Sequence, residues 1–153
     1  MSTDHDRVRA STSQEVLERL DEERLQRVAS CVDAAPGEIA EHLRKLDREW
    51  DVERVLEANA SALTLLGLAL SAVHSRRWLV LSSVVPAFLL QHAIQGWCPP
   101  LTVIRRLGVR TRREIDVERT ALKALRGDFA AGGTGDEDRV VAARRVLEAA
   151  AGR

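Results

Sequence analysis

A long apolar stretch without charged side chains fills the middle of the chain and separates two polar parts. Residues 58–73 contain no Asp, Glu, Lys or Arg, and residues 78–104, which follow the short polar segment 74–77, again contain none. A helix on the surface of a soluble protein needs a polar face, so charge should recur every three or four residues. The pattern therefore predicts two consecutive helices with apolar surroundings.

Both apolar stretches have the length of membrane-spanning helices. A span needs about 20 residues, and the first can run from Val55 to His74 and the second from Arg77 to Gly96. The proline pair at 99–100 ends the second helix, because proline cannot continue a helix that is already under way. The turn between the two helices is short, so they should be antiparallel neighbours. The sequence predicts a transmembrane helical hairpin.

Amphipathic helices are expected before this hairpin. Capping-box patterns that begin at Ser11 and Thr12 predict a helix that ends near the Ala-Ala-Pro-Gly break at residues 34–37. Asp51 is a candidate N-cap for the first apolar helix. A second amphipathic helix between the break and Asp51 carries an apolar stripe at helical spacing, formed by Ile39, Leu43, Leu46 and Trp50.

More helices are expected after the hairpin. A short helix can begin at Pro100 and end at Gly108, and a capping box at Thr111 opens a longer one that Gly127 can end. Thr134 can cap a last short helix. The fold class is therefore all-α, a membrane hairpin flanked by amphipathic cytoplasmic helices. Its expected segments are residues 1–52 (N-terminal helices), 53–98 (hairpin), 99–127 (basic helices) and 128–153 (linker and last helix).

Charge is distributed unevenly along the chain, although the averages resemble those of a soluble protein. The chain is 45% hydrophobic and 30% charged, with a mean hydropathy of −0.17 and a net charge of zero. Residues 1–57 hold 9 basic and 15 acidic side chains, whereas residues 105–126 hold 8 basic and 3 acidic ones. The basic segment follows the apolar stretch directly and lacks interleaved aromatic residues, which favours anionic lipid headgroups over nucleic acid. The candidate headgroup contacts are Arg105, Arg106, Arg110, Arg112 and Arg113.

Tryptophans bracket the second apolar helix. The chain has three, Trp50, Trp78 and Trp97, and no tyrosine. Trp78 and Trp97 would lie about 28 Å apart along a helix, close to the hydrocarbon thickness of a bilayer. Tryptophan is enriched at membrane interfaces, so both are predicted interfacial anchors. The alternative is that they are core residues of a soluble helical bundle.

The flanking basic residues predict the orientation of the hairpin. Only Arg76 and Arg77 lie at its tip, while many basic residues follow its second helix. The positive-inside bias therefore places both termini in the cytoplasm, and the tip arginines would snorkel to headgroups on the far side. The N-terminus has no apolar core of a cleavable signal peptide, so insertion is expected to be driven by the hairpin itself.

Small residues at four-residue spacing occur in both apolar helices. Gly67 with Ser71 and Ser83 with Ala87 are such pairs, and they allow close approach of helix backbones in lipid. Most of these positions are expected to pack within the hairpin, and the rest between copies of the chain. Pro86 is expected to kink the second helix.

Polar and thiol groups near the end of the second helix are candidate sites. Gln91, His92 and Gln95 form one polar cluster, close enough to the interface for water or headgroups to satisfy it. A metal site needs three or four ligands, and Cys98 with a nearby histidine supplies two at most. The two cysteines, Cys31 and Cys98, make no disulfide framework. We find no catalytic constellation and expect no enzyme activity, cofactor or metal.

The segment from Glu53 to Phe129 resembles the YgaP-like transmembrane domain, a family of bacterial inner-membrane proteins mostly of unknown function. The resemblance rests on ERVLEANAS, on the Arg76-Arg77-Trp78 turn and on QHAIQGWCPPL, in which Gly96, Trp97, Cys98 and Pro99 are the most specific part. It implies two membrane helices, self-association through them and residence in the inner membrane. Some members carry a sulfurtransferase domain, whose cysteine-centred loop this chain lacks.

Three functional hypotheses follow. The first is a small, non-enzymatic inner-membrane protein that self-associates through its hairpin and presents cytoplasmic helices to lipid or to a protein partner, with the stripe around Leu43 as the partner surface. The second is a soluble helical-bundle adaptor with the apolar stretch as its core. The third is a thiol-dependent sulfur or redox accessory protein that uses Cys98, since an interfacial cysteine beside basic residues suits such chemistry.

Overall fold

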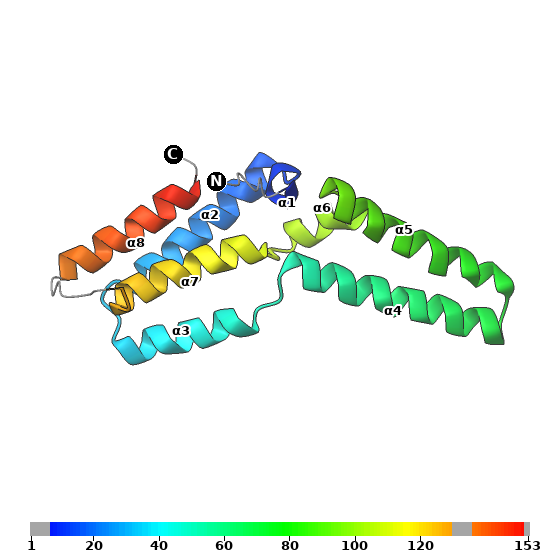
Figure 1. Cartoon of the computed structure of the whole chain (residues 1–153), viewed down its shortest axis with the longest axis horizontal. Coiled ribbons are helices and arrows are strands. Elements are labelled where there is room, and N and C mark those ends of the chain that lie inside the picture. Colours follow the sequence, from blue (N-terminus) through cyan, green and yellow to red (C-terminus); the bar gives the residue numbers. More distant parts are fainter. Residues whose placement is uncertain (1–6, 130–135, 152–153) are drawn as a thin grey trace. The chain divides into compact units, whose positions relative to one another are not determined.

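Every element in the part of the chain that the structure describes is helical (Figure 1). The structure is a computed structural model, and it describes residues 7–129 and 136–151. The elements in chain order are α1 (Arg7–Ala10), α2 (Gln14–Ala29), α3 (Pro36–Arg48), α4 (Val52–Val73), the 3-10 helix η1 (Arg76–Trp78), α5 (Leu79–Gln95), α6 (Pro99–Arg106), α7 (Arg112–Arg126) and α8 (Asp136–Ala151). The all-α prediction is confirmed for these residues, whereas the expected cap at Thr134 lies outside them.

The chain divides into two compact units, each built from two separate stretches of sequence. Unit 1 comprises Met1–Leu17 and Trp50–Thr111, and unit 2 comprises Glu18–Glu49 and Arg112–Arg153. The four consecutive segments expected from the sequence are not the compact bodies of the structure. Local hydrophobic patterns cannot reveal this division into two units, because each unit combines two stretches that are far apart in the sequence.

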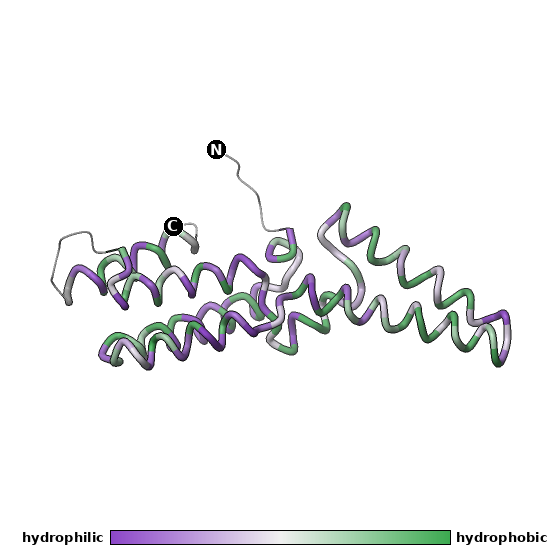
Figure 2. The backbone as a smooth tube through the Cα atoms, turned by 60° about the horizontal axis from the view of Figure 1, so that its bottom comes forward, coloured by the Kyte–Doolittle hydropathy of each residue, from purple (hydrophilic) through white to green (hydrophobic). Residues whose placement is uncertain are grey.

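The hairpin of unit 1 consists of α4 and α5, which run side by side in opposite directions (Figure 1). Asp51 caps α4 as the sequence predicts, since its carboxylate accepts a hydrogen bond from the Arg54 backbone N–H at 2.8 Å. At the other end of the hairpin the Ser75 side chain accepts from the Arg77 N–H and opens η1. Figure 2 shows that apolar residues occupy most of both helices.

The open end of the hairpin, opposite the turn, is closed by α1 and α6 and is called the base here. Its core contains six buried apolar side chains, from α1, α4, α6 and the turn before α6. They are Val8, Val52, Leu56, Cys98, Leu101 and Ile104. The Val52 N–H donates to the Arg110 carbonyl at 3.0 Å, which joins the start of α4 to the segment after α6.

Unit 2 packs the remainder of α2 with α3, α7 and α8 around a second core. That core includes Ile39, Leu43 and Leu46 of α3, which are 3–6% exposed. The prediction that the α3 stripe offers a partner surface is therefore wrong, because unit 2 itself covers it. Trp50 does not belong to the stripe, since α3 ends at Arg48 and Trp50 is 48% exposed.

Ion pairs join α7 to two other helices of unit 2. The Arg27 guanidinium makes a two-pronged contact with the buried Glu118 carboxylate, with N···O distances of 3.2 and 3.3 Å. Arg119 contacts Asp47 of α3 at 2.8 Å. A planar, two-pronged pair such as Arg27–Glu118 fixes the register between its helices as well as stabilising their contact.

Candidate functional site

The outer surface of the hairpin is apolar and exposed. Two helical stretches of the described residues are long and apolar enough to cross a membrane, Pro36–Val73 and Arg76–Gln95, and the charge-free part of the first lies in α4. In the most apolar window of each stretch, only 11% and 0% of the residues are buried. Leu65 and Leu90 are more than 60% exposed. Such a continuous apolar surface marks an interaction site rather than ordinary protein surface.

Close contact between α4 and α5 depends on Gly67. A Cβ atom on this glycine would lie 2.5 Å from the Ser82 Oγ and 3.1 Å from the Trp78 carbonyl oxygen. The Ser82 hydroxyl donates to the Thr64 carbonyl at 3.0 Å, across the same contact. Gly67 thus packs within the hairpin, which is the placement expected for most of the small residues at four-residue spacing.

The predicted partner positions in α5 are different from those in the structure. Ser82 faces α4, whereas Ser83 and Ala87 are exposed, and the Ser83 hydroxyl donates to the Leu79 carbonyl of its own helix. Ser71 is half-buried and donates to the Leu68 carbonyl. Sequence alone could not choose between adjacent faces of α5, because neighbouring small residues, Ser82 and Ser83, occupy both.

All three tryptophans are exposed, and they lie at the two ends of the hairpin. Trp78 is 38% exposed at the tip, and Trp97 is 41% exposed at the base, one residue past the C-cap of α5. Trp50 precedes α4 and stacks against the Arg54 guanidinium, which lies 4.5 Å from the ring centroid. Tryptophan is enriched at membrane–water interfaces, and positions at the two ends of an apolar hairpin fit that preference.

The Gly-Trp-Cys-Pro element forms the junction between α5 and α6. Gly96 ends α5 with a φ of +72°, a left-handed conformation that favours glycine, and a side chain there would collide with Arg7. Arg7 in turn donates to the Ile94 carbonyl at 2.9 Å, one of the carbonyls left open at the end of α5. Cys98 is the N-cap residue of α6, and Pro99 occupies its first turn.

The Cys98 thiol is buried in the base. It is 2% exposed, and this burial raises its pKa above the ordinary value of 9.0, against a smaller lowering by a hydrogen bond with the Leu101 backbone. Cys31 is 1% exposed in unit 2, and burial likewise raises its pKa. Thiolate chemistry needs the opposite setting, an accessible thiol with a lowered pKa. The environment of Cys98 therefore indicates packing rather than reactivity.

Arg105 is a buried structural residue, and the prediction that it contacts lipid headgroups is corrected. It is 1% exposed, its Nε donates to the Thr12 hydroxyl at 3.1 Å, and its Nη1 donates to the Val109 carbonyl at 2.9 Å. The Thr12 hydroxyl donates onward to the Val8 carbonyl at 2.8 Å. Arg105 thereby joins the residues that follow α1 to the end of α6.

The other basic candidates divide by exposure. Arg110 is 5% exposed, so its guanidinium is also not available for headgroup contact. Arg106, Arg112 and Arg113 are exposed, and headgroup contact stays a prediction for them. A charge-based pattern cannot distinguish these cases, because burial depends on which face of each helix meets the rest of its unit.

The polar cluster of α5 lies near the base. The Gln91 side-chain amide N–H donates to the side-chain Oε1 of Gln95, one turn away, at 3.5 Å. His92 is half-buried, and its Nδ1 atom has no hydrogen-bond partner among the described residues. Within the described residues no group of three or more metal-ligating side chains is found.

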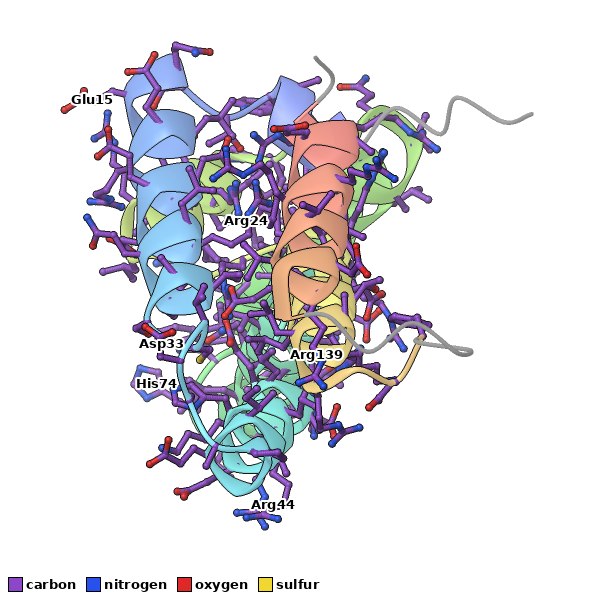
Figure 3. All side chains as sticks on the ribbon, turned by 90° about the vertical axis from the view of Figure 1, so that its left-hand side faces the viewer. Glu15, Arg24, Asp33, Arg44, His74 and Arg139 are labelled. Carbon is purple, nitrogen blue, oxygen red and sulfur yellow. The ribbon has the colours of Figure 1, made fainter. Side chains whose placement is uncertain are left out.

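A groove in unit 2 was not anticipated from the sequence. It has a volume of about 420 Å³ and runs between α2 and α8 with α7 beneath. Its apolar walls include Leu25, Val28 and Leu147, and Arg24 and Arg144 lie on its polar side. Figure 3 shows Arg24 between α2 and α8. No side chains that line it form a nucleophile–base arrangement.

Comparison with known proteins gives no matching family model, no matching curated protein and no matching solved structure. The resemblance to the YgaP-like transmembrane domain thus stays a prediction from the residues quoted for it.

Proposed function

We propose that this chain is a small integral membrane protein without enzymatic activity, anchored by the α4–α5 hairpin. The observation that carries the proposal is the exposure of the charge-free part of α4, residues 58–73, and of α5, which the rest of the described residues leaves largely uncovered. The predicted spans, Val55–His74 and Arg77–Gly96, have 20 residues each, a length of about 30 Å along a helix axis. Both match the hydrocarbon thickness of a bilayer, about 30 Å.

The proposed topology places both ends of the hairpin in the cytoplasm. Two spans return the chain to its starting side, so everything before Asp51 and after Gly96 shares one compartment. Only Arg76 and Arg77 flank the tip, whereas five arginines follow α5 between Arg105 and Arg113. The positive-inside rule counts the Lys and Arg residues in the sequence near each end of a span. Arg105 therefore contributes to it, although its side chain is buried in the folded protein. The resemblance supports the bacterial inner membrane as the location.

Self-association through the hairpin is part of the proposal. Ser83 and Ala87 lie on a face of α5 that α4 does not cover. Small residues one turn apart allow a second helix to approach closely in lipid, where packing drives association. The remaining partners that we propose are anionic headgroups at Arg106, Arg112 and Arg113.

Alkaline carbonate extraction of membranes tests membrane integration. We expect the full chain to remain in the membrane pellet after extraction, because carbonate does not remove proteins whose helices span the bilayer. The matched control replaces two exposed apolar residues with charge, Leu66→Glu and Leu90→Glu, and should move the protein toward the supernatant. Recovery of the unaltered chain as a monodisperse soluble particle without detergent would instead support the soluble-bundle hypothesis.

A further inference from the structure

The helix that follows the hairpin, α6, has an outer face divided into two rows. Its inner face is buried through Leu101, Ile104 and Arg105. On the outside, Val103 is 59% and Leu107 is 77% exposed, and with Pro99 they form an apolar row at four-residue spacing. The exposed Thr102 and Arg106 form a polar row beside it.

From this division we infer that α6 lies in the plane of the membrane interface and inserts Val103 and Leu107 into the headgroup–acyl boundary. The inference rests on the proposed membrane insertion of the hairpin and adds a second, peripheral lipid contact. Its ligand is the bilayer surface itself: the apolar row meets acyl chains, and Arg106 meets anionic headgroups. Interfacial helices have this composition, one apolar and one basic or polar face.

The position of α6 in the chain determines what can cover its apolar row. α5 ends at Gln95, and α6 begins at Pro99 after a junction that contains the exposed Trp97. If α5 crosses the bilayer, α6 starts at the depth where the span ends. Eight residues extend only about 12 Å, too short to cross, so a lipid-facing α6 must lie along the surface.

Site-directed spin labelling in vesicles of phosphatidylcholine with a minority of phosphatidylglycerol tests the inference. The full chain is labelled at Leu107→Cys, at Thr102→Cys on the polar row of the same helix, and at Leu90→Cys in the middle of the exposed surface of α5. Native Cys31 and Cys98 are 1% and 2% exposed, so the unaltered chain should take up little label and serves as the background control. Collision with oxygen, which concentrates in lipid, is compared with collision with a water-soluble nickel complex.

We expect the Leu107 and Leu90 labels to collide several-fold more with oxygen than with the nickel complex, and the Thr102 label to show the reverse ratio. A water-type Leu107 label beside a lipid-type Leu90 label would overturn the interfacial role of α6 alone. Lipid-type labels at both Thr102 and Leu107 would overturn the in-plane orientation. Water-type labels at all three positions would overturn the hairpin proposal too. Val103→Cys, on the same row, replaces Leu107→Cys if that variant does not fold.

Discussion

Gly96 is the residue whose backbone conformation shapes the base of the hairpin. Its positive φ ends α5, and Arg7 packs against it so closely that no side chain fits. The sequence marked this position through the Gly-Trp-Cys-Pro element, but the partner that explains the glycine lies almost ninety residues earlier in the chain. A local motif therefore revealed the site and not its physical cause.

Gly96→Ala should destabilise the folded state by about 2 kcal/mol or more, because the left-handed conformation costs an L-residue about 1–2 kcal/mol and the methyl group also meets Arg7. Denaturant unfolding in detergent micelles measures the difference. The control is Gly37→Ala in α3, where nothing lies within 4 Å of the added Cβ, and its stability should be unchanged or slightly raised. Equal effects of the two substitutions would contradict the role assigned to Gly96.

Arg105 shows where charge patterning fails as a guide. Its place in a basic segment after an apolar helix predicted a lipid contact, yet the guanidinium lies in the interior and bonds to Thr12 and to the Val109 carbonyl. Because the side chain that accepts its hydrogen bond is more than ninety positions away, no local pattern could show this contact.

Arg105→Leu should reduce stability by about 2–4 kcal/mol, since the Val109 carbonyl loses its guanidinium donor in a buried setting. Hydrogen exchange gives a local readout: the Ser11 and Thr12 amides, which donate to carbonyls of α1, should lose protection first. Arg106→Leu, at the exposed neighbouring position, should have a clearly smaller effect on both measurements. Preserved protection in the Arg105 variant would show that Thr12 is held by other contacts.

Burial of Cys98 predicts a specific pH dependence. The folded thiol has a pKa above 9.0, while the unfolded thiol titrates near 9.0, so above that pH the unfolded state binds fewer protons than the folded state. The free energy of unfolding should therefore fall as pH rises above about 9.0, the unfolded value, toward the higher pKa of the folded thiol. Cys98→Ala should weaken this dependence, though Cys31 retains its own share. An equally steep dependence in the variant would show that Cys98 does not contribute.

At the scale of elements, the positions of the helices were readable from the sequence. The spans predicted from Val55 and Arg77 correspond to α4 and to η1 with α5, and the helix predicted between Thr111 and Gly127 is α7. Charge-free runs, capping residues and glycine stops are local signals, which explains this agreement. The face that each helix turns inward was harder to read: Ser82 rather than Ser83 meets α4.

Gly67→Ile should force α4 and α5 apart, because the first added atom already lies 2.5 Å from Ser82 Oγ. Overpacking of this kind costs about 1–3 kcal/mol. Thermal unfolding in detergent should show the loss. Ala69→Ile, on the exposed side of the same helix, supplies the control and should have little effect. If both variants unfold at the same temperature, the hairpin does not rely on close contact at Gly67.

At the scale of the whole molecule, the sequence separated apolar from polar regions but did not show how they assemble. Each unit is discontinuous, with α1 joining the hairpin and α7 joining the helices before it. The stripe proposed as a partner surface became the core of unit 2 for this reason. The apolar stretches, in contrast, are exposed in the structure, as expected of helices that meet lipid.

The central claim is that α4 and α5 cross a membrane and return, and labelling from outside intact cells tests it most directly. A tip probe, His74→Cys, and a unit 2 probe, Asp33→Cys, both occupy exposed positions, while the native cysteines are buried. A membrane-impermeant maleimide should label the tip probe in intact cells and the Asp33→Cys probe only after the membrane is opened. Protection of both probes, or labelling of the Asp33→Cys probe alone, would contradict the two-span, cytoplasmic-termini topology.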